Sequence, residues 1–182
     1  MGDVSAMPAT PGLLQVCDPP RMIRVEPITE AWADALAEGD DAFSARFDVV
    51  VEEGWEGFPE VVPFLVRAAR SASPVQWGPH LVFDEDGALV GNGGWKGLPV
   101  NGVAELGYSV APARRGRGIA TALVFELLAG ARAAGLVEAI AHTLPQESPS
   151  NSVLARCGFA KVEELLDPDD GFVWRWRIRL VE

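Results

Sequence analysis

Residues 114–121 read RRGRGIAT, a run in which glycines alternate with arginines. A strand-like apolar run ends at Val110 before it, and an amphipathic helix pattern begins near Arg117. A glycine-rich turn that enters a helix points several backbone N–H groups toward one place, at the positive end of the helix dipole. The stretch therefore predicts an anion site, and the expected anion is a pyrophosphate.

Two familiar phosphate loops do not fit this stretch. A Walker loop needs a lysine next to its last glycine, and the sequence has no lysine between Lys96 and Lys161. A dinucleotide loop needs glycine or alanine three places after Gly118, where this chain has Thr121. A third kind of phosphate loop is therefore expected.

The remaining pattern, Arg115-x-x-Gly118-x-Ala120, resembles the acetyl-CoA loop of the GNAT superfamily of N-acetyltransferases, Gln/Arg-x-x-Gly-x-Gly/Ala. Its flanks add to the resemblance: ELGYSVAP at residues 105–112, and VL at 153–154 with CGF at 157–159. Residues 143–154 are similar to the branch that contains the ribosomal-protein N-terminal acetyltransferases. The resemblance covers about residues 22–181 and is strongest over residues 103–160.

Periodicity predicts one mixed domain over residues 21–182, preceded by a flexible leader over residues 1–20. Strands are expected at 22–28, 81–83, 88–95, 103–110, 137–143 and 172–181, and helices at 30–37, 61–72, 117–135 and 150–156. The resemblance implies an α/β (α+β) fold of GNAT type. In that fold a mixed, mostly antiparallel central sheet is flanked by helices, and a splayed pair of strands holds acetyl-CoA.

Composition excludes several kinds of partner. A net charge of −11 opposes sequence-independent binding to nucleic acid, which depends on Lys and Arg. No run approaches the roughly 20 apolar residues of a membrane span, and Asp3 stands where a signal peptide would be basic. Only Cys17 and Cys157 are present, so no disulfide framework is expected. We therefore expect a cytoplasmic protein that binds no nucleic acid and no membrane.

The resemblance implies that acetyl-CoA is the co-substrate and that backbone groups hold it. The strand before the loop would pair with the pantetheine, the loop would hold the pyrophosphate, and the start of the last predicted helix would contact CoA near its sulfur. The implied cofactor residues are Tyr108, Ser109, Val110, Arg115, Gly116, Arg117, Gly118, Ile119, Ala120, Thr121, Ser150 and Asn151.

Glu105 is the candidate general base, because it places a carboxylate inside an otherwise apolar strand. Side chains alternate along a strand, so Glu105, Gly107 and Ser109 should share one face. The resemblance supports the same role, acting directly on the amine or through a water. An edge glutamate without a catalytic role is the alternative.

Ser150 is the second candidate catalytic residue, because the departing thiolate needs a proton or a hydrogen bond. The family's usual tyrosine is missing, since the only tyrosine, Tyr108, lies in the earlier strand. Ser150 is equally suited to be a helix N-cap, and both roles could hold at once. The branch usually has an asparagine two or three residues before this serine, where this chain has Ser148 and Glu147.

No metal site is expected, because neither His80 nor His142 has further ligands at a suitable spacing. Cys157 is interpreted as a small core residue. The six tryptophans are expected in the core, except that Trp55, between glycines, and Trp95 are candidate walls of a substrate pocket.

The predicted function is direct acetyl transfer from acetyl-CoA to a primary amine, either a peptide N-terminus or a small amine. The alternative is a catalytically idle CoA- or acyl-CoA-binding sensor or partner module, and a longer acyl donor is also open. Acidic residues between positions 40 and 56 favour a cationic acceptor unless they form only a solvated face. A homodimer, formed through the sheet edge or the last strand, is a further possibility.

Overall fold

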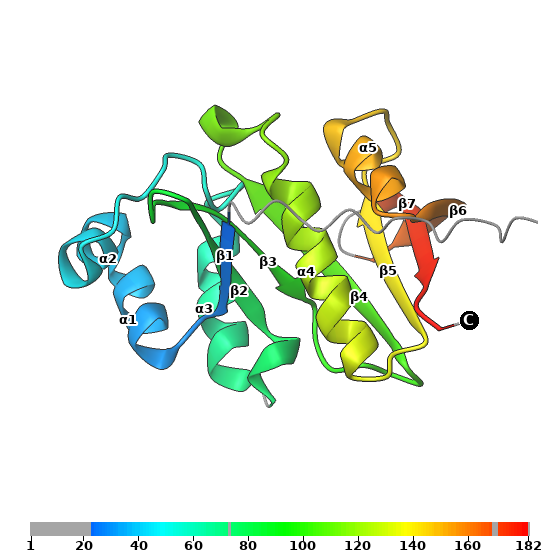
Figure 1. Ribbon diagram of the computed structural model, residues 1–182, viewed down its shortest axis with the longest axis horizontal. Helices are drawn as coiled ribbons and strands as arrows, with labels where there is room; N and C mark the ends of the chain where they lie inside the picture. Colours follow the sequence, from blue (N-terminus) through cyan, green and yellow to red (C-terminus); the bar gives the residue numbers. More distant parts are fainter. Residues whose placement is uncertain (1–22, 73, 169–170, 182) are drawn as a thin grey trace, which may run out of the picture.

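The computed structural model describes residues 23–72, 74–168 and 171–181. Figure 1 shows the elements in chain order. They are β1 (Ile23–Pro27), α1 (Glu30–Glu38), α2 (Asp40–Phe47), α3 (Val61–Ser71), β2 (Pro79–Asp84), β3 (Leu89–Trp95), β4 (Val103–Val110), α4 (Ile119–Ala133), β5 (Glu138–Thr143), α5 (Pro149–Arg156), β6 (Ala160–Asp167) and β7 (Gly171–Arg179). Short 3-10 turns lie at Val75–Trp77 and Pro112–Arg114.

The strands of the described residues form one seven-stranded sheet in the order β1-β2-β3-β4-β5-β7-β6. Neighbouring strands run antiparallel except β4 and β5, which are parallel. The predicted mixed, mostly antiparallel sheet is therefore confirmed. None of the described helices is both long and apolar enough to cross a bilayer.

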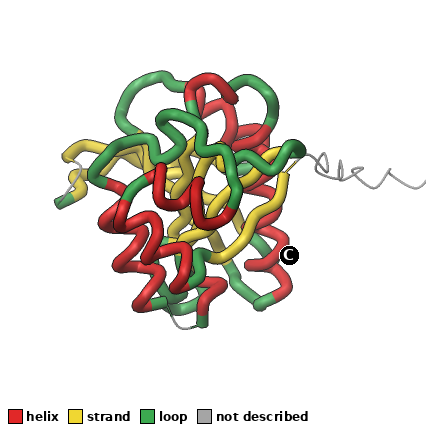
Figure 2. Tube along the Cα trace, turned by 90° about the vertical axis from the view of Figure 1, so that its left-hand side faces the viewer, coloured by secondary structure: helices red, strands yellow, loops and turns green. Residues whose placement is uncertain are grey.

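Helices cover both faces of the sheet, and each side has its own core (Figures 1 and 2). Alternate residues of β2 show why: Val82 packs with the α4 side, whereas Leu81 and Phe83 pack with the α1–α3 side. The helix stripe predicted after the glycine loop is buried in the α4-side core, and it consists of Ile119, Leu123, Leu127 and Ala131.

The parallel strands β4 and β5 separate after a short paired stretch. Residues 103–105 of β4 pair with residues 138–140 of β5, with Glu105 opposite Ile140 as the last pair. Both strands continue beyond that point, to Val110 and Thr143. The sheet therefore opens from Glu105 onward, which confirms the expected splayed pair.

Most predicted elements are found within a few residues of their expected limits. Thr29 caps α1, because its Oγ1 accepts the Trp32 backbone N–H at 3.2 Å. Two elements were not predicted: α2, which buries only Phe43, and β6, an edge strand with no buried residue. Their sequences carry little apolar periodicity because they bury little surface. The leader expected over residues 1–20 lies outside the described residues.

Candidate active site

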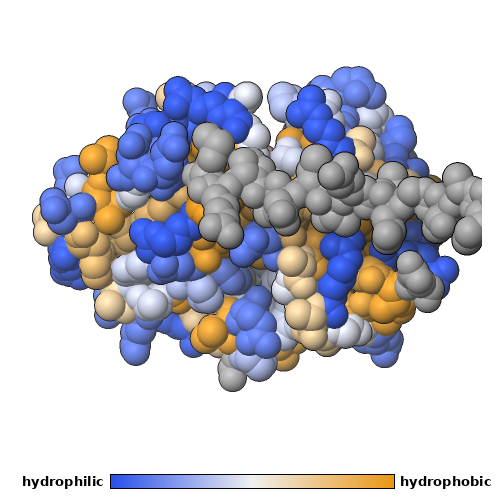
Figure 3. Space-filling view, in the orientation of Figure 1, coloured by the Kyte–Doolittle hydropathy of each residue, from blue (hydrophilic) through white to orange (hydrophobic). Residues whose placement is uncertain are grey.

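A cleft of about 280 Å³ opens between the splayed strands. Its lining includes β4, the end of β5 and the start of α5, and it contains Lys96, Gly107, Tyr108, His142, Thr143, Gln146, Ser148 and Ser150. In Figure 3 the upper edge of the molecule is indented between the part that holds the loop before α4 and the part that holds α5. We call this space the cleft.

Glu105 stands where the strands part, and two nitrogen atoms converge on one of its carboxylate oxygens. Lys96 Nζ lies 2.6 Å from Glu105 Oε1, and His142 Nδ1 lies 3.0 Å from the same oxygen. The Glu105 side chain is 23% exposed, so it remains within reach of a molecule in the cleft. Both donors, Lys96 and His142, line the cleft, so they place this partly buried carboxylate beside it, where a general base could act.

His142 was not predicted to lie in the site. It follows Ile140 by two residues on β5, so it shares the face of the residue paired with Glu105. Its other ring nitrogen accepts a hydrogen bond from Arg175 Nε at 3.0 Å, and Arg175 also pairs with Glu163 at 2.7 Å. This contact could have been predicted only from the register of the parallel strands β4 and β5, and that register depends on tertiary structure.

The glycine loop lies at the open end of the split, before α4. Gly116 and Gly118 both have positive φ, 75° and 83°. Gly118 is the N-cap residue of α4, and its carbonyl accepts the Ala122 N–H. The N–H groups of residues 118–121 are those that helix geometry leaves without an intrahelical acceptor. The exposed loop can therefore donate several backbone hydrogen bonds to one anion.

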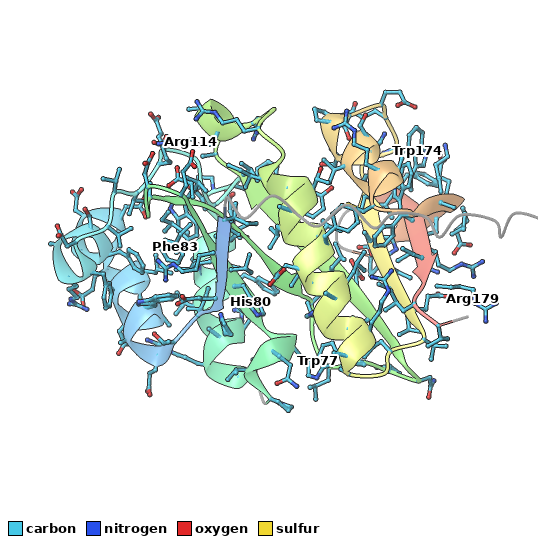
Figure 4. The ribbon with its side chains drawn as sticks, viewed as in Figure 1. Trp77, His80, Phe83, Arg114, Trp174 and Arg179 are labelled. Carbon is cyan, nitrogen blue, oxygen red and sulfur yellow. The ribbon has the colours of Figure 1, made fainter. Side chains whose placement is uncertain are left out.

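Arginines around this loop are held in different ways. Arg115 Nε donates to the Val110 carbonyl at 3.0 Å, which fixes its stem against β4. Arg114 (Figure 4) pairs with Glu52 at 2.6 Å and with Asp84 at 2.9 Å. The hydrogen bond from Arg114 holds the pKa of Glu52 below its ordinary value. Arg114 is thus a structural clamp for the loop, and Arg115 and Arg117 remain the predicted phosphate-side cations.

Ser150 lies in the first turn of α5 and lines the cleft. Helix α5 begins at Pro149, so the N-cap position belongs to Ser148, and the alternative reading of Ser150 as the cap is wrong. Tyr108 Oη donates to the Ser150 carbonyl at 3.2 Å and so joins β4 to α5 across the cleft. Burial raises the pKa of Tyr108 to about 12.

Asn151 is buried and its amide is used within the loop before α5. Its Nδ2 donates to the Gln146 carbonyl, and its Oδ1 accepts from Ser148 Oγ, both at 3.0 Å. Asn151 can therefore shape the wall of the cleft through these bonds.

The remaining predicted cofactor residues, Ser109 and Val110, lie on the part of β4 beyond its pairing with β5. They pair with Asn92 and Gly91 of β3 on one side only. Backbone groups of a strand alternate in direction, so those that face β5 are available to an extended ligand, apart from the Val110 carbonyl, which accepts from Arg115 Nε.

Both tryptophans proposed as pocket walls are core residues. Trp55 is fully buried and its Nε1 donates to Asp40 Oδ1 at 3.2 Å. Trp95 is 6% exposed and packs edge-on against Trp77, with ring centroids 5.6 Å apart. The pocket-wall interpretation is wrong because both rings are buried in the core. Asp40 and Glu52 also have internal partners, which weakens the argument for a cationic acceptor from that acidic run.

Within the described ranges, no three His, Cys, Asp or Glu side chains are grouped as metal ligands would be. Cys157 is buried, as expected of a core residue, and burial raises its pKa to about 11.

Comparison with known proteins is consistent with the geometry. The sequence model of the Acetyltransferase (GNAT) family matches residues 47–159. The mycothiol acetyltransferase of Nocardia farcinica is 34% identical over 140 residues, which are 76% of this chain and 43% of that protein. The chain therefore spans less than half the length of this curated relative.

Solved structures share the fold at low sequence identity. The microcin C7 self immunity acetyltransferase MccE, in complex with acetyl-CoA and AMP, is 15% identical with a TM-score of 0.66, covering 88% of this chain and 93% of that chain. Mycobacterium smegmatis RimJ, in complex with CoA-disulfide, is 24% identical with a TM-score of 0.60, covering 86% and 81%. At these identities the likeness concerns the fold alone.

Proposed function

The chain belongs to the GNAT family of acetyltransferases, and we propose that it transfers an acetyl group from acetyl-CoA directly to a primary amine. The observation that carries the proposal is the position of Glu105, at the point where β4 and β5 part, with its carboxylate against two residues that line the cleft, Lys96 and His142. A base belongs at this point, because a thioester held between the strands would meet an amine there.

The residues around the split fit acetyl-CoA. The free N–H groups at the start of α4 suit a pyrophosphate, and the one-sided pairing of Ser109 and Val110 suits the amides of a pantetheine. Bound in this way, acetyl-CoA would supply the activated acetyl group. The cofactor set proposed from the sequence is kept, with Arg114 added as the clamp that holds the loop.

Glu105 is proposed to take a proton from the acceptor's ammonium, directly or through a water, so that the amine nitrogen has a free electron pair. Gly107, two residues along the same face of β4, leaves room beside it. A Cβ at Gly107 would meet only Lys96 Cε, at 3.7 Å. The acceptor amine is proposed to enter over this glycine.

Ser150 is proposed to give a hydrogen bond or a proton to the departing thiolate sulfur. It lines the cleft on the α5 side, and the Tyr108 hydroxyl holds its backbone in place. With its pKa near 12, Tyr108 remains a neutral donor at physiological pH and serves this positioning role.

The acceptor is proposed to be a peptide N-terminus or a small amine. Because one relative is a mycothiol acetyltransferase, the acceptor of that enzyme should also be tested. Residues 21–182 are proposed to form the acetyltransferase domain, with residues 1–20 as a leader, and the protein is proposed to act in the cytoplasm. The exposed edge strand β6 is proposed as the contact surface of a homodimer.

Release of CoA from acetyl-CoA tests the proposal. The assay would use purified full chain against peptide N-termini, amino acids, polyamines, aminoglycosides and the acceptor of mycothiol acetyltransferase. Turnover with one class supports the proposal and names the acceptor. Tight binding of acetyl-CoA with no turnover on any class would instead indicate the idle CoA-binding sensor.

A further inference from the structure

A line of polar contacts runs away from Glu105 across the sheet, on the face that carries the cleft. It passes from Glu105 on β4 to His142 on β5, to Arg175 on β7 and to Glu163 on β6. The first two distances along the line are both 3.0 Å, and the third, from Arg175 to Glu163, is 2.7 Å. His142 and Arg175 directly oppose each other in the β5–β7 register.

The chemistry of the two partners of His142, the carboxylate of Glu105 and the guanidinium of Arg175, decides where its proton lies. A guanidinium has N–H donors and no acceptor. Because Arg175 Nε donates to His142 Nε2, that ring nitrogen carries no proton. The proton of the neutral ring is therefore on Nδ1, and Nδ1–H donates to Glu105 Oε1. The His142 side chain is only 8% exposed, so water competes little for these bonds.

This arrangement also limits what His142 can do. A ring whose Nε2 already accepts a bond from Arg175 cannot take up a second proton without losing that bond. His142 is thus a fixed donor to Glu105 and is poorly placed to carry protons away. The contacts of Glu105 with Lys96 and His142 both use Oε1, so neither of them engages Oε2.

We propose that His142 and Arg175 are positioning residues for Glu105: Arg175 holds the ring of His142 through its bare Nε2, and His142 fixes the orientation of the catalytic carboxylate. The inference rests on the proposed function, in which Glu105 is the base. It assigns a role to Arg175 on β7, a strand that the sequence predicted over residues 172–181 without a part in the site.

The first test measures the tautomer and does not depend on activity. The sequence has only two histidines, so side-chain ¹⁵N NMR at neutral pH can separate His142 from His80 with a His80→Gln reference sample. The expected spectrum has a protonated Nδ1 and a bare Nε2 for His142. In Arg175→Met the carboxylate of Glu105 still requires Nδ1–H, so the tautomer should persist, whereas the Nε2 resonance should shift because that nitrogen has lost its donor. A wild-type ring protonated on Nε2, or an Nε2 resonance unchanged by Arg175→Met, overturns the proposal.

The second test compares variants that keep or lose the donor, using whichever acceptor gives turnover. His142→Gln retains an N–H that can reach Glu105, whereas His142→Leu removes it. We expect His142→Leu to lower kcat about 10- to 100-fold, the cost of a misplaced catalytic group, with the KM for acetyl-CoA unchanged. His142→Gln should recover most of the lost kcat.

Arg177→Gln is the matched control, since Arg177 lies on the same face of β7 and pairs with Glu138 at 3.8 Å, away from His142. It should keep wild-type kcat. Unchanged kcat in His142→Leu, or an equal loss in His142→Gln with both variants folded by thermal melting, overturns the positioning role. Failure of the proposed function looks different, because wild type itself then releases no CoA with any acceptor.

Discussion

The ammonium of Lys96 lies 2.6 Å from Glu105 Oε1, so the proposed base is already paired with a cation of its own chain. Lys96 follows β3 directly, and its backbone N–H donates to the Glu105 carbonyl, which brings the two side chains onto one face. The Lys96 side chain is 45% exposed. An exposed ion pair is worth about 1 kcal/mol or less, so an incoming ammonium can displace it.

Lys96→Met should therefore make a cationic acceptor bind more easily. Removal of a competitor worth up to about 1 kcal/mol should lower the KM of the acceptor by up to roughly fivefold, with little change for acetyl-CoA. Steady-state kinetics checks this, with Lys161→Met as control, since Lys161 stacks on Trp174 outside the cleft. A raised acceptor KM in Lys96→Met would mean that Lys96 helps to bind the acceptor.

Gly107→Val should block the acceptor while leaving the fold intact. The site has room for a Cβ, and a β-branched residue suits a strand, so we expect the melting temperature to change little. The added methyl groups would occupy the floor between Glu105 and Ser109 and lower kcat/KM for the acceptor at least about tenfold, the lower end of what an added group costs in a close-fitting site. Wild-type kcat/KM in the folded variant would place the acceptor elsewhere.

Ser150→Ala separates catalysis from helix capping. Because Ser150 is inside the first turn of α5, its replacement should leave the free energy of unfolding nearly unchanged, while kcat falls about 10²-fold, the lower range for loss of a proton donor. Ser148→Ala is the comparison: loss of its bond to Asn151 should cost about 1 kcal/mol of stability. Chemical denaturation and steady-state kinetics on both variants test these roles. A stability loss confined to Ser150→Ala would contradict the assignment of Ser150 to catalysis and of Ser148 to stability.

Tyr108 can be titrated alone, because it is the only tyrosine in the sequence. Burial raises its pKa to about 12, above the ordinary value near 10. The folded protein therefore keeps the proton that the unfolded chain loses first, so this contribution to stability is complete below about pH 10 and is lost as the pH rises toward 12. Absorbance at the tyrosinate band, with Tyr108→Phe as blank, should show a midpoint well above 10 for as long as the fold persists. A midpoint at 10 in the folded protein would show an exposed phenol.

Local patterns were enough to predict the parts of the site that are local in the chain. The strand, the glycine loop and the helix follow one another along the chain. Their geometry therefore depends on consecutive residues. The face shared by Glu105 and Gly107 follows from strand alternation in the same way.

Contacts that depend on register could not be predicted. His142 reaches Glu105 only because β5 pairs in parallel with Ile140 opposite Glu105, and Arg175 reaches His142 only through the β5–β7 register. The burial of Trp55 also depends on tertiary structure. Trp55 lies between glycines, which leave the loop free to place its ring in the core or in solvent, and the hydrogen bond to Asp40 forms only in the core. These contacts depend on pairing between residues that are far apart in the sequence, which local sequence patterns do not reveal.

The central claim is that Glu105 is the base of an acetyl transfer, and the most direct measurement is the rate of CoA release by Glu105→Gln beside wild type. The amide keeps the size of the side chain and can still accept the His142 N–H, so acetyl-CoA affinity should stay the same. We predict that kcat falls at least about 10²-fold, the contribution of a general base. Wild-type turnover in the folded Glu105→Gln variant would contradict the claim.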